Sequence, residues 1–235
     1  MRGTMENKSL STAFADSLKD ESIACIGEYA EIGLDAVMED GILKDIPIVS
    51  TTITLYKIGN SIKERHNLKK LLIFLNEINN GIADEEKRKD YQQKFESNEK
   101  FRNQQIEYLL VLIDRYIDYD KPQMLAKLYL AYLDGTVIWE ELTMYAEVID
   151  RFLPLDCKFL ISKSDAYKTY RNIGAEPILR LVALGLMVED IGQTLFVDDG
   201  RGGLSITSTS MERSKNKERI YKKTEFGEKL ATILR

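Results

Sequence analysis

Apolar residues recur at helical spacing in one segment after another between Ile23 and Ile149. Residues that repeat at intervals of three and four share one face of a helix, so this pattern predicts a series of amphipathic helices. The segment from Leu68 to Ile78 is apolar around most of its circumference, and we therefore predict it as the central helix of a bundle. The predicted stripes are Ile23, Ile26, Ala30, Leu34 and Val37; Leu68, Leu71, Leu72, Leu75 and Ile78; Tyr108, Leu109, Leu112, Ile113 and Tyr116; Leu125, Leu128, Tyr129 and Tyr132; and Ile138, Leu142, Tyr145, Ala146 and Ile149.

The apolar segment Ile46–Ile62 supports two interpretations. Lys57, Gly59 and Asn60 interrupt it, and it is shorter than the ~20 residues that a membrane-spanning helix needs. We predict a helix that packs inside the bundle and no transmembrane segment. An apolar helix with basic residues toward one end also suits a membrane surface, so a membrane-acting protein remains the alternative.

The pattern changes after Asp150. The segment Phe152–Asp156 is interpreted as a linker, and Pro177–Leu184 as a short helix that ends at Gly185. Short apolar runs then predict a hairpin of Leu186–Val188 with Thr194–Val197 around a turn at positions 190–192. A last strand is predicted over Arg219–Lys222, and a closing helix begins after Thr224, which can cap it.

Charge changes sign near the same point. The chain of 235 residues has a formal charge of −5, with −9 in residues 1–157 and +4 in residues 158–235. A negative total argues against a general nucleic-acid binder but leaves a local basic face open. We predict a mainly α protein: an N-terminal extension at 1–20, a helical bundle at 21–152 and a small α+β domain at 158–235.

Three partial resemblances add to this picture. The turn in ALGLMVED (183–190) and the closing Thr224-Glu-Phe-Gly227-Glu-Lys-Leu230 resemble the end of a winged-helix domain, with residues 198–218 inserted in or near the wing. The stretch Leu128–Glu141, with its Asp-Gly turn before an acidic residue, is similar to tellurite-resistance B-like helical domains. Residues 46–78 resemble uncharacterised helical proteins of bacteria and their prophages, so a stress or phage-response setting is implied.

The chain lacks the residues that the most common catalytic and metal sites require. The two cysteines, Cys25 and Cys157, form no CxxC pair, and His66 is the only histidine, so we expect no metal, no cofactor and a cytoplasmic protein. His66 could still act as a base or sense pH, or simply occupy a polar helix junction. Two further candidates each have two interpretations. The carboxylates Glu28, Glu31, Asp35 and Glu39 lie along one side of a predicted helix and form either a cation site or a solvated face. The segment Gly200–Gly203 is either a phosphate-binding loop or the tip of a wing.

The most suggestive functional stretch is the basic run between residues 205 and 223. Lysine, arginine and hydroxyl side chains together suit contacts with DNA phosphates, although such a run is also found in solvated loops. We expect a non-enzymatic regulator or adaptor that binds a protein partner, with possible contact to double-stranded DNA through the basic wing. A membrane-acting effector and an enzyme of unfamiliar type are the alternatives. The sequence does not indicate the oligomeric state. The candidate nucleic-acid-binding residues are Arg213, Lys215, Lys217, Arg219, Lys222 and Lys223.

Overall fold

The computed structural model describes residues 13, 17, 50, 61–81, 99–162, 164, 166–170, 175–190, 194–198, 204–208 and 218–235. The chain divides into two compact units, Met1–Asp150 and Arg151–Arg235. Helices account for 73% of the described residues, which confirms the prediction of a mainly helical protein. The predicted helices from Ile23 to Val37 and in Ile46–Ile62 fall almost wholly outside the described residues.

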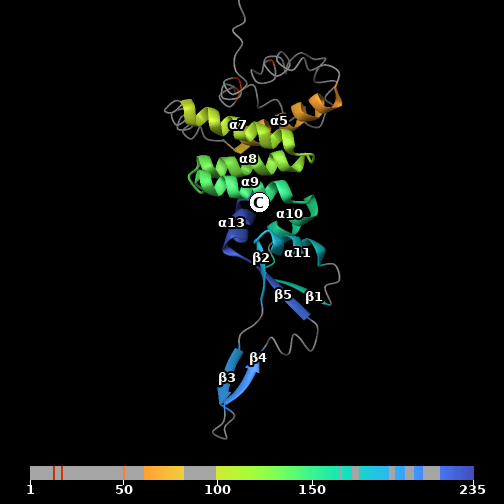
Figure 1. Cartoon of the computed structure of the whole chain (residues 1–235), viewed down its shortest axis with the longest axis vertical. Coiled ribbons are helices and arrows are strands. Elements are labelled where there is room, and N and C mark those ends of the chain that lie inside the picture. The colour runs from red at the N-terminus through yellow and green to blue at the C-terminus, as the bar shows by residue number, and fades with distance from the viewer. Residues whose placement is uncertain are drawn as a thin grey trace, which may run out of the picture. The chain divides into compact units, whose positions relative to one another are not determined.

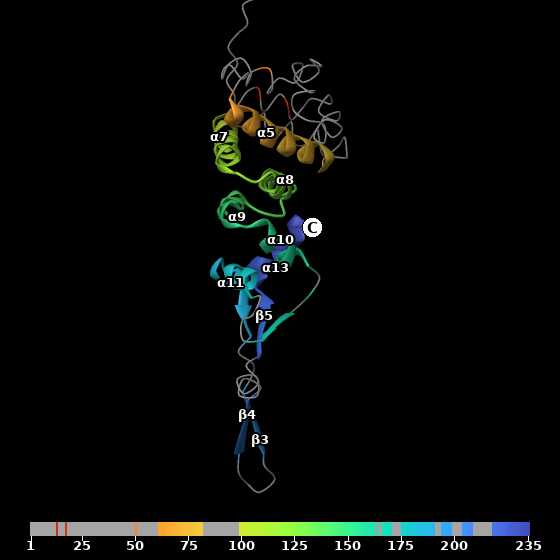
Figure 2. The same ribbon diagram turned by 90° about the vertical axis from the view of Figure 1, so that its right-hand side faces the viewer.

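Helices stack against one another in the N-terminal unit, and α5 packs on both α7 and α8 (Figures 1 and 2). The rings of Tyr108 on α7 and Trp139 on α9 meet edge to face with centroids 5.6 Å apart, which joins these two helices. The predicted stripe of α5 is buried throughout, from Leu68 to Ile78, as expected for a central helix. The described helices of this unit are α5 (Ile62–Gly81), α7 (Glu99–Arg115), α8 (Asp120–Leu133) and α9 (Trp139–Arg151).

Turn chemistry builds the corner between α8 and α9. Gly135 takes a φ of 77°, which a side chain would strain, and its N–H donates to the Tyr132 carbonyl at 3.0 Å. Glu141 then accepts a hydrogen bond from the N–H of Ile138 at 3.1 Å and so caps the start of α9. The prediction that Ile138 lies in the core is wrong: it precedes the first turn of α9 and is 60% exposed.

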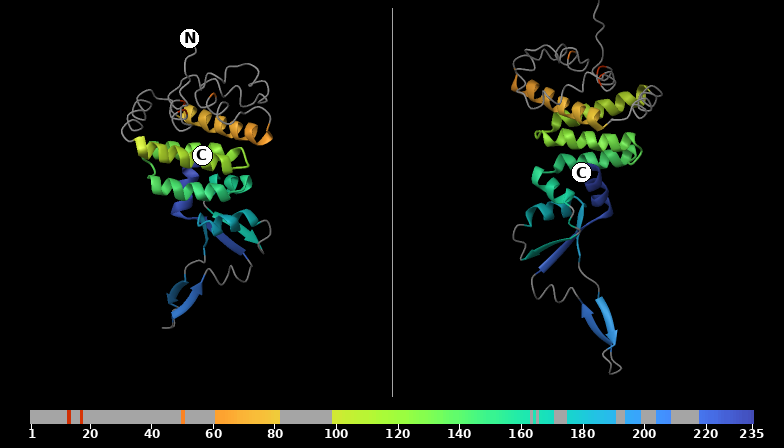
Figure 3. Two further views of the ribbon diagram at one scale, coloured as in Figure 1. Left: turned by 45° about the horizontal axis from the view of Figure 1, so that its top comes forward. Right: turned by 180° about the vertical axis from the view of Figure 1, so that it is seen from behind.

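The C-terminal unit contains a three-stranded antiparallel sheet in the order β1-β5-β2. Helix α10 contacts α11 and α13, while α11 contacts β2 and α13 contacts β5, so the three helices gather beside the sheet (Figure 3). The elements are α10 (Pro154–Ile161), β1 (Ala166–Tyr170), α11 (Glu176–Ala183), β2 (Met187–Glu189), β5 (Glu218–Lys223) and α13 (Glu225–Leu234), with a separate hairpin of β3 (Thr194–Asp198) and β4 (Leu204–Ser208).

The predicted hairpin of Leu186–Val188 with Thr194–Val197 is wrong. Strand β2 pairs with β5, and β3 pairs with β4. The ladder of β2 on β5 continues at both ends, since the Thr224 N–H donates to the Leu186 carbonyl at 3.0 Å and Asp190 donates to a β5 carbonyl at 2.7 Å. A partner distant in sequence therefore replaces the nearest strand.

The predicted linker at Phe152–Asp156 is also wrong, because α10 begins at Pro154. Proline suits the first helical turn, where its missing N–H costs nothing. Asp156 accepts a hydrogen bond from the Leu153 N–H at 3.1 Å, which caps the same turn. The predicted closing helix is confirmed: Thr224 caps α13 by accepting from the Gly227 N–H at 3.0 Å.

Candidate functional site

Strand β5 carries three of the six predicted nucleic-acid-binding residues, Arg219, Lys222 and Lys223. The other three, Arg213, Lys215 and Lys217, lie outside the described residues. Successive residues of a strand point to opposite faces of the sheet. The β5 cations are therefore divided between two faces, with Arg219 and Lys223 on one and Lys222 on the other.

Arg219 and Lys222 each form an ion pair with an acidic residue at the end of β2. The Arg219 guanidinium lies 3.3 Å from the Glu189 carboxylate, and the Lys222 ammonium lies 3.1 Å from Asp190. The pKa of Arg219 is raised, first by the neighbouring Tyr221 hydroxyl and then by Glu189. Both basic side chains are about half exposed, so their charge is partly neutralised at the surface.

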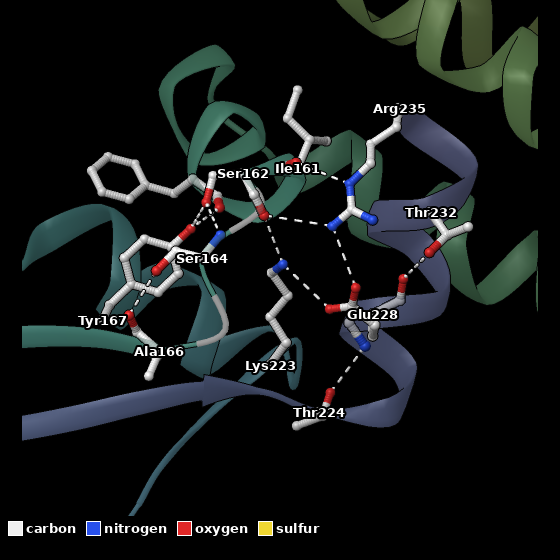
Figure 4. A network of polar contacts seen from close by, with 12 residues as sticks. Ile161, Ser162, Ser164, Ala166, Tyr167, Lys223, Thr224, Glu228, Thr232 and Arg235 are labelled. Atoms are coloured by element: carbon white, nitrogen blue, oxygen red, sulfur yellow. Dashed lines mark hydrogen bonds and ion pairs between the residues drawn. The ribbon is translucent and has the colours of Figure 1, made fainter.

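Lys223 is buried in a polar network rather than presented to solvent (Figure 4). Its side chain is 5% exposed, and its ammonium donates to the Ser162 carbonyl at 2.8 Å and pairs with Glu228 at 3.3 Å. Arg235 joins the same carboxylate at 3.3 Å and donates to the Ile161 carbonyl at 3.1 Å. These contacts satisfy carbonyls at the end of α10, so Lys223 holds α10, β5 and α13 together.

A second polar contact, which the sequence patterns did not indicate, joins α10 to α11. The Asp156 carboxylate is fully buried and accepts from the Arg180 guanidinium at 2.6–3.0 Å. This bidentate geometry is the strong form of an arginine–carboxylate pair, and the hydrogen bond to Asp156 raises the pKa of Arg180. The Pro154 and Asp156 spacing is a helix-start pattern that could have located α10 from sequence.

Three exposed leucines lie on α10 and α11 or at the start of α10. Leu155 and Leu179 directly precede Asp156 and Arg180 in the chain and are 53% and 41% exposed, and Leu153 at the start of α10 is 48% exposed. Because α10 and α11 contact each other, the leucines belong to one fixed pair of helices. We name Leu153, Leu155 and Leu179 the leucine rim.

His66 serves as a link between α5 and the segment that follows α7. Its Nε2 lies 2.9 Å from the Ile117 carbonyl, so this nitrogen donates, and Nδ1 lies 2.9 Å from the Tyr119 hydroxyl. Beside it, Lys70 is buried and its ammonium donates to the Asp114 carbonyl at 2.9 Å. Both nitrogens of the imidazole are thus engaged in joining helices, as expected for the helix-junction interpretation.

The described residues form none of the other predicted catalytic or metal-binding sites. No group of three or more histidine, cysteine, aspartate or glutamate side chains in the described residues is placed to hold a metal ion. Cys157 is a free, buried thiol. The remaining candidates lie outside the described residues: Cys25, the carboxylate line Glu28, Glu31, Asp35 and Glu39, and Gly200–Gly203.

The segment Ile46–Ile62, predicted as a helix inside the bundle with a membrane surface as the alternative, is described only at residues 50, 61 and 62. Within the described part of the chain, every helix is too short or too polar to cross a membrane.

Comparison of the chain with protein-family models, curated proteins and solved structures finds no match.

Proposed function

We propose that this protein is a non-enzymatic adaptor that binds a protein partner through helices α10 and α11 of its C-terminal unit. The observation that carries the proposal is the leucine rim, three leucines that are 41–53% exposed on two helices that contact each other. Single exposed leucines are common on protein surfaces, but three within two short, contacting helices favour an interaction site.

The arrangement also has the chemistry of an interface centre. The buried centre of an interface is more apolar than the rest of the surface, and arginine is enriched there. Arg180 is already held by Asp156 through three contacts between donor and acceptor atoms of 2.6–3.0 Å. Fixing a long side chain before binding reduces the entropy lost when a partner docks.

The charges of β5 support a protein partner over a polyanion. Each basic residue described on this strand, Arg219, Lys222 and Lys223, has an acidic partner within 3.3 Å. A DNA phosphate would have to compete with those carboxylates, and burial keeps Lys223 from solvent.

Affinity capture on the tagged full-length chain tests the proposal. Extract from the source cell is treated with nuclease and passed over wild type, the double variant Leu155→Glu/Leu179→Glu, and Val188→Glu, which alters an exposed residue on β2. We expect wild type and Val188→Glu to retain the same protein and the double variant to lose it, with all three showing the same thermal unfolding. Retention by all three, or by none, would contradict the proposal.

Duplex DNA contact through a winged-helix-like C-terminal unit is the second candidate. It is favoured by the antiparallel pairing of β2 with β5, which leaves residues 190–217 as the connection where a wing would lie, and by α13, which follows β5 directly. Between β1 and β2 the described residues contain one helix, α11. Its Arg180 is engaged by Asp156, so DNA contact would depend on Arg213, Lys215 and Lys217.

A further inference from the structure

Two buried hydroxyl groups on one face of the β1-β5-β2 sheet have no hydrogen-bond partner in the described part of the chain. They belong to Thr169 on β1, which is 6% exposed, and to Tyr221 on β5, which is 1% exposed. A buried hydroxyl without a partner lowers stability, and such groups in native proteins usually meet water or a ligand. The two hydroxyls therefore point to a polar guest.

Arg219 lies next to both hydroxyls. It is directly opposite Thr169 in the register of β1 with β5 and two residues before Tyr221 on the same strand, so all three side chains share a face. Directly opposite residues have Cβ atoms about 4.5–5.5 Å apart. Half of the Arg219 side chain is exposed, which gives a ligand access from solvent.

Glu189 engages the guanidinium only in part. One carboxylate oxygen lies 3.3 Å from one Arg219 nitrogen, whereas a guanidinium carries five N–H donors. The Tyr221 hydroxyl lies beside the Arg219 guanidinium and is the first cause of its raised pKa, and no described residue other than Arg219 approaches this hydroxyl as a hydrogen-bond partner. Donors on Arg219, Tyr221 and Thr169 thus lie on neighbouring positions of one sheet face.

We propose that Arg219, Thr169 and Tyr221 together bind a phosphate group. The guanidinium supplies positive charge and parallel N–H donors, and the two hydroxyls donate to further oxygens of a tetrahedral anion. The site goes beyond the proposed partner-binding surface, because it lies on the sheet and uses none of the leucine rim.

Titration of the ¹⁵N-labelled full-length chain with inorganic phosphate tests the site, with sodium chloride at matched ionic strength as the reference. We expect saturable shifts of the amide signals of Thr169, Arg219 and Tyr221. Thr169→Val, Tyr221→Phe and Arg219→Gln should each weaken phosphate binding by about tenfold or more, because each removes a hydrogen bond to a charged group. Glu189→Gln should tighten binding by removing a like charge.

A matched control uses the opposite face of the sheet. Lys168→Gln removes an exposed cation of β1 that lies opposite Ile220 in the register with β5 and should leave phosphate affinity unchanged. Thr169→Val and Tyr221→Phe preserve side-chain size, so we expect both to fold. If they raise the unfolding temperature without weakening phosphate binding, the hydroxyls are simply unpaired core groups and the site is overturned.

A competition experiment identifies which kind of molecule supplies the phosphate group. A short DNA duplex that displaces inorganic phosphate from the wild type would assign the site to a phosphodiester backbone, and failure to displace it would assign the site to a free phosphate compound. Both results uphold the site. The absence of any saturable phosphate shift in the wild type would overturn it.

Discussion

Gly227 of α13 lies directly against the backbone carbonyl of Leu186: a Cβ atom at position 227 would be 2.0 Å from the Leu186 oxygen. Gly185, which precedes Leu186 in the turn after α11, makes a second contact with the start of α13: the Thr224 hydroxyl donates to the Gly185 carbonyl at 2.8 Å. The glycine of the closing helix and the Leu-Gly-Leu turn after α11 are therefore two halves of one contact. This contact sets where α13 begins.

Gly227→Ala should strongly destabilise the C-terminal unit, because the new methyl group would meet backbone rather than a flexible side chain. We expect a loss of about 3 kcal/mol or more, the upper range for overpacking, measured by urea denaturation followed by circular dichroism. Gly185→Ala is the control: its Cβ has nothing within 4 Å, but φ is 74°, so only backbone strain of about 1–2 kcal/mol is expected. Equal losses would argue against the close contact.

Asp156→Asn should lower the stability of the same unit for two reasons. The substitution weakens the cap on the Leu153 N–H, for which about 0.5–2 kcal/mol is typical, and it removes the charge that holds Arg180. Asp150→Asn is a comparison, because that residue pairs with the half-exposed Arg115 and such pairs contribute little. If both variants unfold at the same urea concentration as wild type, Asp156 does not join α10 to α11.

Tyr116→Phe should leave stability at neutral pH unchanged or slightly higher, because the buried Tyr116 hydroxyl has no partner in the described part of the chain. Burial, and next the Asp150 charge, raise the pKa of Tyr116 above its ordinary 10.0. Below pH 10.0 the Tyr116 hydroxyl stays protonated in both the folded and the unfolded state. Above pH 10.0 it ionises first in the unfolded state, which is thereby stabilised, so the wild type loses stability as the pH rises. Urea midpoints from pH 8 to 11.5 should fall less steeply for Tyr116→Phe; parallel curves would show that the hydroxyl is accessible to water.

Duplex DNA binding, if the basic segment provides it, should depend only shallowly on salt. Six phosphate contacts would give a log–log slope of about −5, whereas three would give about −3. We expect a slope nearer the shallower value in fluorescence anisotropy, because Lys222 is ion-paired and Lys223 is buried against Glu228. Reversing Arg213, Lys215 and Lys217 to glutamate should abolish binding. A slope near −5 would mean that the β5 ion pairs open on DNA.

The helices of this protein could be predicted from sequence because helical periodicity is a local property. The stripes Leu68–Ile78 and Tyr108–Tyr116 and the cap at Thr224 needed only residues within a few turns. Strand pairing is not local: β2 has only three residues and pairs with β5, about thirty positions later, where the turn after α11 contacts the start of α13.

The candidate site was predicted only as a run of charge. Sequence spacing indicates the basic residues but not their partners, so it places Lys223 with the surface cations although this residue is buried beside Glu228. The leucine rim was missed for a related reason. The proline in Phe152–Asp156 is typical of a linker, although proline in a first helical turn followed by an aspartate cap also predicts a helix.

The affinity of the full-length chain for the protein it captures is the most direct test of an adaptor that uses α10 and α11. Titration calorimetry would compare wild type, Leu155→Glu/Leu179→Glu and Val188→Glu against that purified partner. Charged groups at the centre of an apolar interface commonly cost several kcal/mol, so we expect the double variant to bind at least about 100-fold more weakly and Val188→Glu to bind as wild type does. Equal affinity of all three proteins would contradict a partner-binding role for the leucine rim.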